Sequence, residues 1–268
     1  MLKLVLVIFA SLIVTGCEGN DTVIDETLPT TIHFAIDDEI DEHGWQNFIT
    51  IESNTDDIIT FVEINSIRHP NVATRRDLAQ FGDYEDAFGY NFYEQAKEIE
   101  QSLVGLSRDE LADAIRIANH DNIVDFDTTS FANLASLALQ HGAIDVGNYI
   151  DGWYQSVSDI DEEGLRYYVN LYVLHGSIIA VHWNAVNEEG VLMYDPQTGA
   201  AISYEALQWS FQAQLVEQEL IQRQDPALFA FDEDGLSTDI TNIDIKVESF
   251  ISLATEALAA GPLTREAR

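Results

Sequence analysis

Two stretches of the chain, 120 residues apart, carry the same order of apolar and polar positions. In the first stretch, residues 48–51 and 58–64 alternate between apolar and polar side chains on either side of a polar turn. In the second, residues 167–173 and 178–183 alternate in the same way on either side of a His-Gly turn. A period of two residues is typical of half-buried β-strands, so each stretch predicts a β-hairpin.

A helical pattern follows each hairpin, with apolar residues spaced so that they share one face of a helix. These positions are Phe92, Ala96, Ile99 and Leu103 in the first stretch and Trp209, Ala213, Val216 and Leu220 in the second. A further helix is expected after each of them. Residues 107–110 have the form of a capping box, and Asp225-Pro226 is an N-cap residue followed by proline at the first helical position.

The ends of the two stretches also match, at an offset of 119 residues. Val124-Asp125 aligns with Ile243-Asp244, and each predicts a short strand before a last apolar helix. Both last helices are followed by a glycine, Gly142 or Gly261, which is a typical helix end. Several blocks that match in the same order, at offsets of 117 to 120, indicate an internal duplication.

The predicted fold class is therefore α+β, with two tandem copies of one small unit. Each copy has the order hairpin, variable loop, helix, helix, short strand, helix. The predicted division of the chain is residues 1–16 as a signal peptide, 17–30 as a lipidated cysteine with an acidic tether, 31–146 as the first repeat, 147–262 as the second repeat and 263–268 as a tail.

The N-terminus has the pattern of an export signal. Lys3 is followed by an apolar run, Leu4–Val14, that is too short to span a bilayer. The next residues, Thr15-Gly16-Cys17, complete a sequence that resembles the lipobox of bacterial lipoproteins, in which the cysteine is acylated. Cys17 is the single cysteine among 268 residues, so disulfide formation within the chain does not explain it. The alternatives are an ordinary cleaved signal peptide and an uncleaved anchor.

Charge narrows the range of partners. The chain has 12 Lys and Arg against 47 Asp and Glu, a formal net charge of −35, which argues against nucleic acid as a partner. With 46% hydrophobic residues, it is also unlike a disordered acidic tail. We expect a protein held by lipid at the cell membrane or outer membrane, facing the periplasm or the exterior.

The order of elements resembles the FMN-binding domain of flavin-carrying electron-transfer proteins, above all membrane-anchored lipoproteins with two such domains. Asp41, Gly44 and Trp45 carry the likeness in the first copy, and residues 151–154 with Gly164 carry it in the second. The resemblance covers residues 31–260. It implies an Asp-x-x-Ser/Thr-Gly-Ala-Thr/Ser loop before the last helix, whose final hydroxyl forms a phosphoester with FMN.

This chain departs from the family at that loop. Residues 124–131 and 243–250 both lack the Gly-Ala pair, and Asp127 and Glu248 would repel a phosphate. Thr128 and Thr129 are the candidate FMN acceptors, with a helix N-cap role as the alternative. Ser249 is interpreted as a cap as well. We therefore expect no cofactor, and keep FMN as the alternative.

Other chemistries lack their characteristic patterns. None of the seven histidines is paired at a metal-ligand spacing, and the acidic runs lack the spacing of a calcium loop, so we expect no metal site. No Gly-x-Ser-x-Gly motif is present. The four tryptophans are expected in the core. The predicted role is non-catalytic binding or assembly with an envelope protein or a small molecule; the alternative is an extracytoplasmic, flavin-carrying electron-transfer protein.

Overall fold

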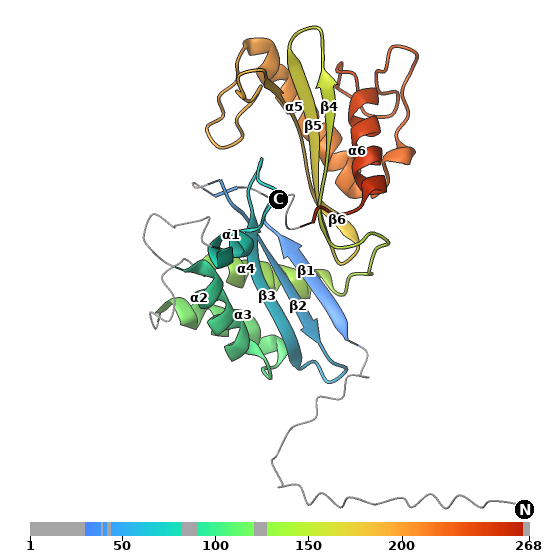
Figure 1. Cartoon of the computed structure of the whole chain (residues 1–268). Coiled ribbons are helices and arrows are strands. Elements are labelled where there is room, and N and C mark those ends of the chain that lie inside the picture. The colour runs from blue at the N-terminus through green and yellow to red at the C-terminus, as the bar shows by residue number, and fades with distance from the viewer. Residues whose placement is uncertain (1–29, 39, 42–43, 82–90, 121–127, 265–268) are drawn as a thin grey trace, which may run out of the picture.

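The structure is a computed structural model that describes residues 30–38, 40–41, 44–81, 91–120 and 128–264. Two α+β units follow one another along the chain (Figure 1). The first contains β1 (Thr31–Ile36), β2 (Gln46–Ser53), β3 (Ile59–Ile67), α1 (Arg75–Phe81), α2 (Phe92–Leu103), α3 (Arg108–His120) and α4 (Thr129–His141). The second contains β4 (Gly152–Ile160), β5 (Leu165–Leu174), β6 (Ser177–Asn187), α5 (Tyr204–Arg223), the 3₁₀-helix η1 (Pro226–Leu228) and α6 (Glu248–Ala260).

Both sheets are antiparallel and three-stranded, with the middle strand in sequence also in the middle of the sheet. In the first sheet Phe48 of β2 lies opposite Asn65 of β3. In the second, Tyr168 of β5 lies opposite Asn184 of β6. The two pairs are equivalent at offsets of 120 and 119, so the duplication extends to the strand register.

The middle strands are buried on both faces, because successive side chains of a strand point to opposite sides. Ile49 and Ile51 of β2 join the core beneath α2, α3 and α4. Val169 and Leu171 of β5 join the core beneath α5 and α6. Thr50 and Asn170, the residues between these pairs, face the opposite side of their sheets and contact the other unit.

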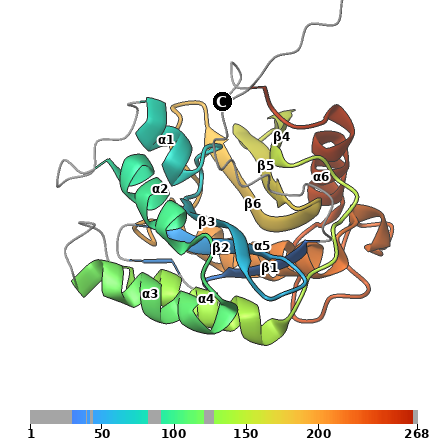
Figure 2. The same cartoon turned by 90° about the horizontal axis from the view of Figure 1, so that it is seen from below.

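A shared apolar cluster joins the two units on these opposite faces. Its buried members are Phe48, Ile67, Trp153, Tyr172, Leu174 and Ala180. The rings of Phe48 and Tyr172 lie 6.0 Å apart between centroids. Two polar contacts flank the cluster: Thr50 Oγ1 lies 3.0 Å from His175 Nε2, and Asn170 Nδ2 donates to Pro70 O at 3.0 Å. Figure 2 shows the strands of both units between α2 on one side and α6 on the other.

The predicted hairpins, helix stripes and helix ends are confirmed. The second hairpin turns at His175-Gly176 with φ of 52° and 72°. All four predicted stripe residues of α2 are buried, as are three of the four in α5. The capping box is partly formed: Glu110 accepts from the backbone N–H and the hydroxyl of Ser107, whereas a full box would have the hydroxyl accepting.

Four expectations differ from the structure. Each sheet has an additional first strand, β1 or β4, and the first repeat has a short helix, α1, that the patterns did not predict. After Asp225 the chain forms a three-residue 3₁₀-helix in place of a longer helix. Ile243-Asp244 is not a strand; only Lys246 nearby forms a bridge, to Leu236. Val124-Asp125 lies outside the described residues.

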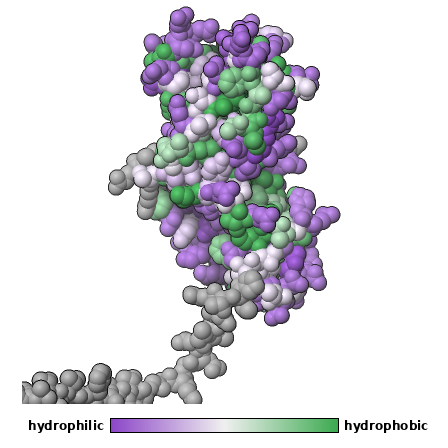
Figure 3. Space-filling view, turned by 90° about the vertical axis from the view of Figure 1, so that its right-hand side faces the viewer, coloured by the Kyte–Doolittle hydropathy of each residue, from purple (hydrophilic) through white to green (hydrophobic). Residues whose placement is uncertain are grey.

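In the described part of the chain, no helix is both long and apolar enough to cross a membrane. Apolar patches lie among a largely polar surface on the face drawn in Figure 3. The signal peptide, Cys17 and all but the last residue of the tether lie outside the described residues.

Candidate ligand-binding site

A cleft of about 520 Å³ opens between α5 and β6 and extends to the first unit. Its lining comprises Asp38, Ile40, Gln46 and His69 from the first unit and Val181, His182, Trp183, Asn184, Tyr194, Pro196, Trp209, Ser210, Gln214, Glu217 and Gln218 from the second. Both repeats therefore contribute to one site.

Glu217 is a buried carboxyl group in the lining of this cleft. It projects from α5, and its Oε1 accepts the backbone N–H of Trp183 in β6 at 2.6 Å. The same oxygen lies 3.8 Å from His182 Nδ1. Burial raises the pKa of Glu217 to about 8, because the hydrogen bond from Trp183 only partly offsets the loss of solvation. A carboxyl group shifted this far inside a cleft is typical of a functional site.

Two histidines from different units stack beside this carboxyl group. His69 follows β3, and its ring lies 4.6 Å from the ring of His182, with 23° between the ring planes. Burial lowers the pKa of His69 to about 4. Burial, and secondarily the neighbouring His69, hold the pKa of His182 well below its usual value. Both rings are therefore neutral near pH 7.

His182 also has an unsatisfied ring nitrogen. The residue is 6% exposed, and its Nε2 has no hydrogen-bond partner among the residues that the structure describes. If the proton is on Nδ1, which faces Glu217, Nε2 carries a lone pair and is an acceptor. Buried polar atoms are rarely left unpaired, so His182 has a hydrogen-bonding capacity beside the cleft that folding leaves unused.

Aromatic rings form one wall of the cleft. Trp183 is buried, and its ring meets that of the half-buried Trp209 edge-on at 4.6 Å. Trp45 and Trp153 are core residues, as expected for tryptophans here, but Trp183 and Trp209 also line the site. An exposed indole face favours flat or cationic groups.

Ser210, a hydroxyl residue in the lining, donates its hydrogen bond to the Leu207 carbonyl of its own helix at 2.8 Å. Among the described residues, no group of three or more His, Cys, Asp or Glu side chains is placed to hold a metal ion.

The candidate FMN acceptors lie elsewhere, at the start of α4. Thr128 is fully buried, and its hydroxyl donates to the Ile115 carbonyl at 3.0 Å. It occupies the N-cap position of α4 but makes no side-chain cap hydrogen bond. Thr129 is the first, exposed residue of that helix. Asp127 lies outside the described residues, and Ser249 lies inside α6, so it is not the cap.

Thr128 does not fit a covalent FMN acceptor, because its buried hydroxyl faces the core and donates to the Ile115 carbonyl. The neighbouring Ser130 hydroxyl donates to Asp37 at 2.7 Å. The cleft does not suit a phosphate either, because the part of its lining that the structure describes has Asp38 and Glu217 but neither Lys nor Arg.

In the acidic runs around Asp41 and Asp161, aspartate side chains accept hydrogen bonds from the backbone of a turn. Asp41 Oδ1 accepts the Trp45 N–H at 2.8 Å. In the equivalent place of the second repeat, Asp161 Oδ1 accepts the N–H groups of Glu163 and Leu165 at 2.9 and 2.8 Å. Hydrogen bonds from Asp to the backbone of the following residues are a usual feature of turns.

Sequence reasoning did not find Glu217, His182 or His69. One signal was present: Glu100 and Glu217 each follow a buried alanine of the helical stripe by four residues, at the same position in both copies. A glutamate on the edge of an apolar stripe, retained in two diverged copies, indicates a buried role.

Comparisons with known proteins identify no family. No protein-family model matches the chain, and no curated protein matches it. A protein from Clostridium thermocellum, solved by solution NMR, is 35% identical over 43% of this chain and 95% of its own length, with a TM-score of 0.37.

Proposed function

We propose that the protein is a lipid-anchored binding protein of the cell envelope, attached to the membrane through Cys17, and that its ligand occupies the Glu217 cleft. The proposal includes no catalytic step. The lipobox-like N-terminus supports the anchor, and the short acidic segment after Cys17 would hold the two units near the membrane surface.

One observation carries the binding role. A cleft of about 520 Å³ is lined by Glu217, a buried carboxyl group, and by His182, whose buried Nε2 has no partner in the described part of the chain. These groups lose solvation on folding without gaining a full set of hydrogen bonds, so they destabilise the empty protein. A ligand that donates hydrogen bonds would offset this cost.

The anchor is tested by replacing the cysteine. Cells expressing the full chain are labelled with a palmitate analogue, and the chain is compared with Cys17→Ser. We expect label and membrane association in the parent chain and loss of both in the variant, because a hydroxyl does not replace the thiol in this acylation. Label that persists in the variant would refute the anchor.

The cleft is tested by ligand screening. The full chain in detergent is heated with a panel of amino acids, amines, short peptides and sugars, and the Tm is recorded. Gln214→Trp narrows the cleft from α5, and Gln208→Trp places the same bulk on that helix outside the lining. We expect one or more panel members to raise the Tm of the parent chain and of Gln208→Trp. The Tm of Gln214→Trp should not rise, because its cleft is narrowed.

Two results would contradict a binding role at this site. One is a panel without any stabilising member. The other is equal stabilisation of both tryptophan variants. A yellow protein with flavin fluorescence after denaturation would instead support the electron-transfer alternative.

A further inference from the structure

The two repeats hold a glutamate in the same structural position. In the first repeat Glu100 of α2 accepts the Ile64 N–H of β3 at 2.7 Å. In the second, Glu217 of α5 accepts the Trp183 N–H of β6 at 2.6 Å. The residue after each strand donor is an asparagine whose Oδ1 accepts the next backbone N–H at 2.8 Å. The two carboxyl groups are therefore counterparts.

In the first repeat the chain supplies its own cation to this carboxylate. Arg76 of α1 donates from Nη1 to Glu100 Oε1 at 2.5 Å. The neighbouring Arg75 places its guanidinium carbon 4.3 Å from the centre of the Phe92 ring. A carboxylate and an aromatic ring thus each receive a guanidinium group from α1.

The second repeat retains the carboxyl group and the aromatic ring but lacks the two arginines. The counterpart of Phe92 is Trp209, whose ring lines the cleft. Residues 188–203 replace the segment that contains α1, and they include neither Lys nor Arg. Among the described residues, the lining of the cleft includes no Lys or Arg.

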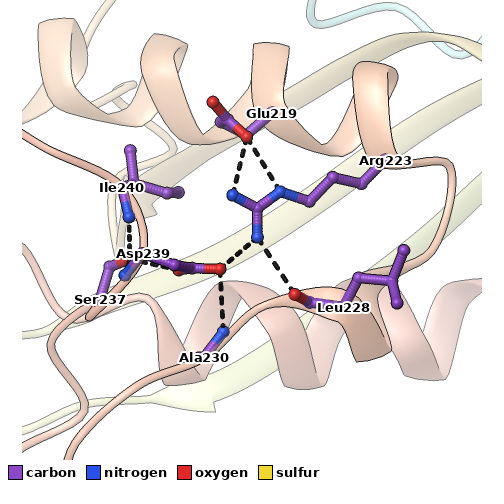
Figure 4. A network of polar contacts seen from close by, with 7 residues as sticks. All are labelled: Glu219, Arg223, Leu228, Ala230, Ser237, Asp239 and Ile240. Atoms are coloured by element: carbon purple, nitrogen blue, oxygen red, sulfur yellow. Dashed lines mark hydrogen bonds and ion pairs between the residues drawn. The ribbon is translucent and has the colours of Figure 1, made fainter.

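The arginine of α5 is engaged elsewhere. Arg223 Nε donates to Glu219 Oε2 at 2.9 Å, and its Nη1 donates to the Leu228 carbonyl and to Asp239 (Figure 4). This network fastens the loop after η1 to α5 and leaves Glu217 without a guanidinium partner from its own helix.

We propose that the Glu217 cleft binds the guanidinium group of an arginine-containing ligand, in the place where the first repeat holds its own Arg76. The inference rests on the proposed binding function and names the ligand's chemistry. The Glu217 carboxylate accepts N–H groups of the guanidinium, and the Trp209 ring covers its face. The net charge of −35 attracts such cations toward the protein.

The groups around Glu217 make this binding dependent on pH. His182 faces it from β6, Tyr168 from β5, His69 from the segment after β3, and Asp38 from across the cleft. Because the two histidines are neutral, none of these groups supplies a positive charge near pH 7. Burial raises the pKa of Glu217 to about 8, whereas Glu100, beside Arg76, has a pKa of about 7. Guanidinium binding therefore releases a proton from Glu217.

The test compares N-acetyl-arginine amide with N-acetyl-citrulline amide, which has nearly the same shape and no charge. The full chain in detergent is titrated by calorimetry at pH 8, and quenching of Trp183 and Trp209 fluorescence is followed in parallel. We expect the arginine compound to bind about 10- to 100-fold more tightly, the range for a charge-assisted hydrogen bond. Its affinity should rise as the pH increases from 6 to 8.

Matched variants locate the effect. Glu217→Gln keeps an oxygen for the Trp183 N–H and should remove the preference for arginine over citrulline. Glu100→Gln makes the same change at the counterpart position, where Arg76 is the partner, and should retain the preference. Circular dichroism confirms that each variant is folded.

Equal binding of the two compounds, or an unchanged preference in Glu217→Gln, would overturn the guanidinium assignment. The binding function would survive that result if other panel compounds still required an open cleft. Free L-arginine and the tripeptide acetyl-Ala-Arg-Ala-amide distinguish the source of the group. Tighter binding of the tripeptide supports a protein partner, and tighter binding of the amino acid supports a small molecule.

Discussion

Glu217 must keep a hydrogen bond to the main chain of β6 in a place where water does not solvate its charge. An unfolded chain ionises this carboxyl near the ordinary pKa of 4.5, whereas the folded chain retains the proton until about pH 8. Between these values the folded state binds the additional proton. The free energy of unfolding contributed by Glu217 therefore falls as the pH rises through this window, and the lost stability returns when the pH is lowered.

We expect Glu217→Gln to remove this dependence. The amide oxygen can still accept the Trp183 N–H, and the side chain no longer ionises. Relative to the parent, the variant should gain stability progressively between about pH 5 and pH 8, with little further change above pH 8. Urea unfolding at a series of pH values measures the difference. A difference that is constant over the range would contradict the burial argument.

Thr128 has a structural role that explains why a hydroxyl residue stands at the start of α4. Its Oγ1 is fully buried and donates to the Ile115 carbonyl, which ties α4 to α3. Thr128→Val keeps the shape and removes the donor. We expect a loss of about 1 kcal/mol in the free energy of unfolding, measured by urea denaturation. A neutral or stabilising effect would show that this hydrogen bond does not hold the two helices together.

At the scale of elements, α1 is a helix that the first repeat has and the second lacks. It brings Arg76 to Glu100, and both side chains are largely buried, at 19% and 10% exposure. Removing one partner of such a pair leaves a charge buried without compensation. Burial already raises the pKa of Glu100 to about 7 despite the opposing effect of Arg76, so loss of the arginine should raise it further.

We expect Arg76→Met to cost about 3 kcal/mol of unfolding free energy at pH 8, and less at pH 5, where Glu100 is protonated and needs no cation. Arg116→Met is the matched control. Arg116 pairs with Asp113 on the exposed face of α3, so its loss should cost less than about 1 kcal/mol at either pH. Equal losses for the two arginines would contradict the distinction between a buried pair and an exposed one.

The helices α4 and α6 end in the same way in both repeats, at a glycine with positive φ. Gly142 and Gly261 have φ of +88° and +84°, with ψ of −167° and 176°, a region that is open almost only to glycine. No atom of the described residues lies within 4 Å of a Cβ placed at either position, so the cost of a side chain comes from the backbone. Gly142→Ala and Gly261→Ala should each cost about 1–3 kcal/mol by thermal or urea unfolding. A loss at one position only would indicate that the two helix ends are not equivalent.

Local patterns account for what was predictable at this scale. Alternation predicted β2, β3, β5 and β6, and apolar stripes predicted α2 and α5, because one face of each is packed against its own unit. The strands β1 and β4 were missed because fewer of their residues are buried than in β3 and β6, the other edge strands. The helix α1 was missed because it buries no residue. The cleft was missed because His69, His182 and Glu217 meet only when two units and three segments are brought together.

At the scale of the whole molecule, the two units depend on one another through the shared cluster around Phe48, Trp153 and Tyr172. These rings are supplied by the strand faces that the helices leave open. The same contact brings Asp38, Gln46 and His69 to the cleft of the second repeat. Weakening this contact should therefore reduce both the cooperativity of unfolding and the affinity for the ligand.

We expect Phe48→Ala to remove about 3–5 kcal/mol of stability and to separate the unfolding of the two units. The ratio of van 't Hoff to calorimetric enthalpy should fall below its value in the parent chain, because the units no longer melt as one. Phe131→Ala, inside the core of the first unit, should cost a similar amount with a smaller change in this ratio. Only Phe48→Ala should also weaken binding of N-acetyl-arginine amide at temperatures where both units remain folded, because it loosens the placement of His69 over His182. An unchanged enthalpy ratio in Phe48→Ala would show that the units are coupled by other contacts.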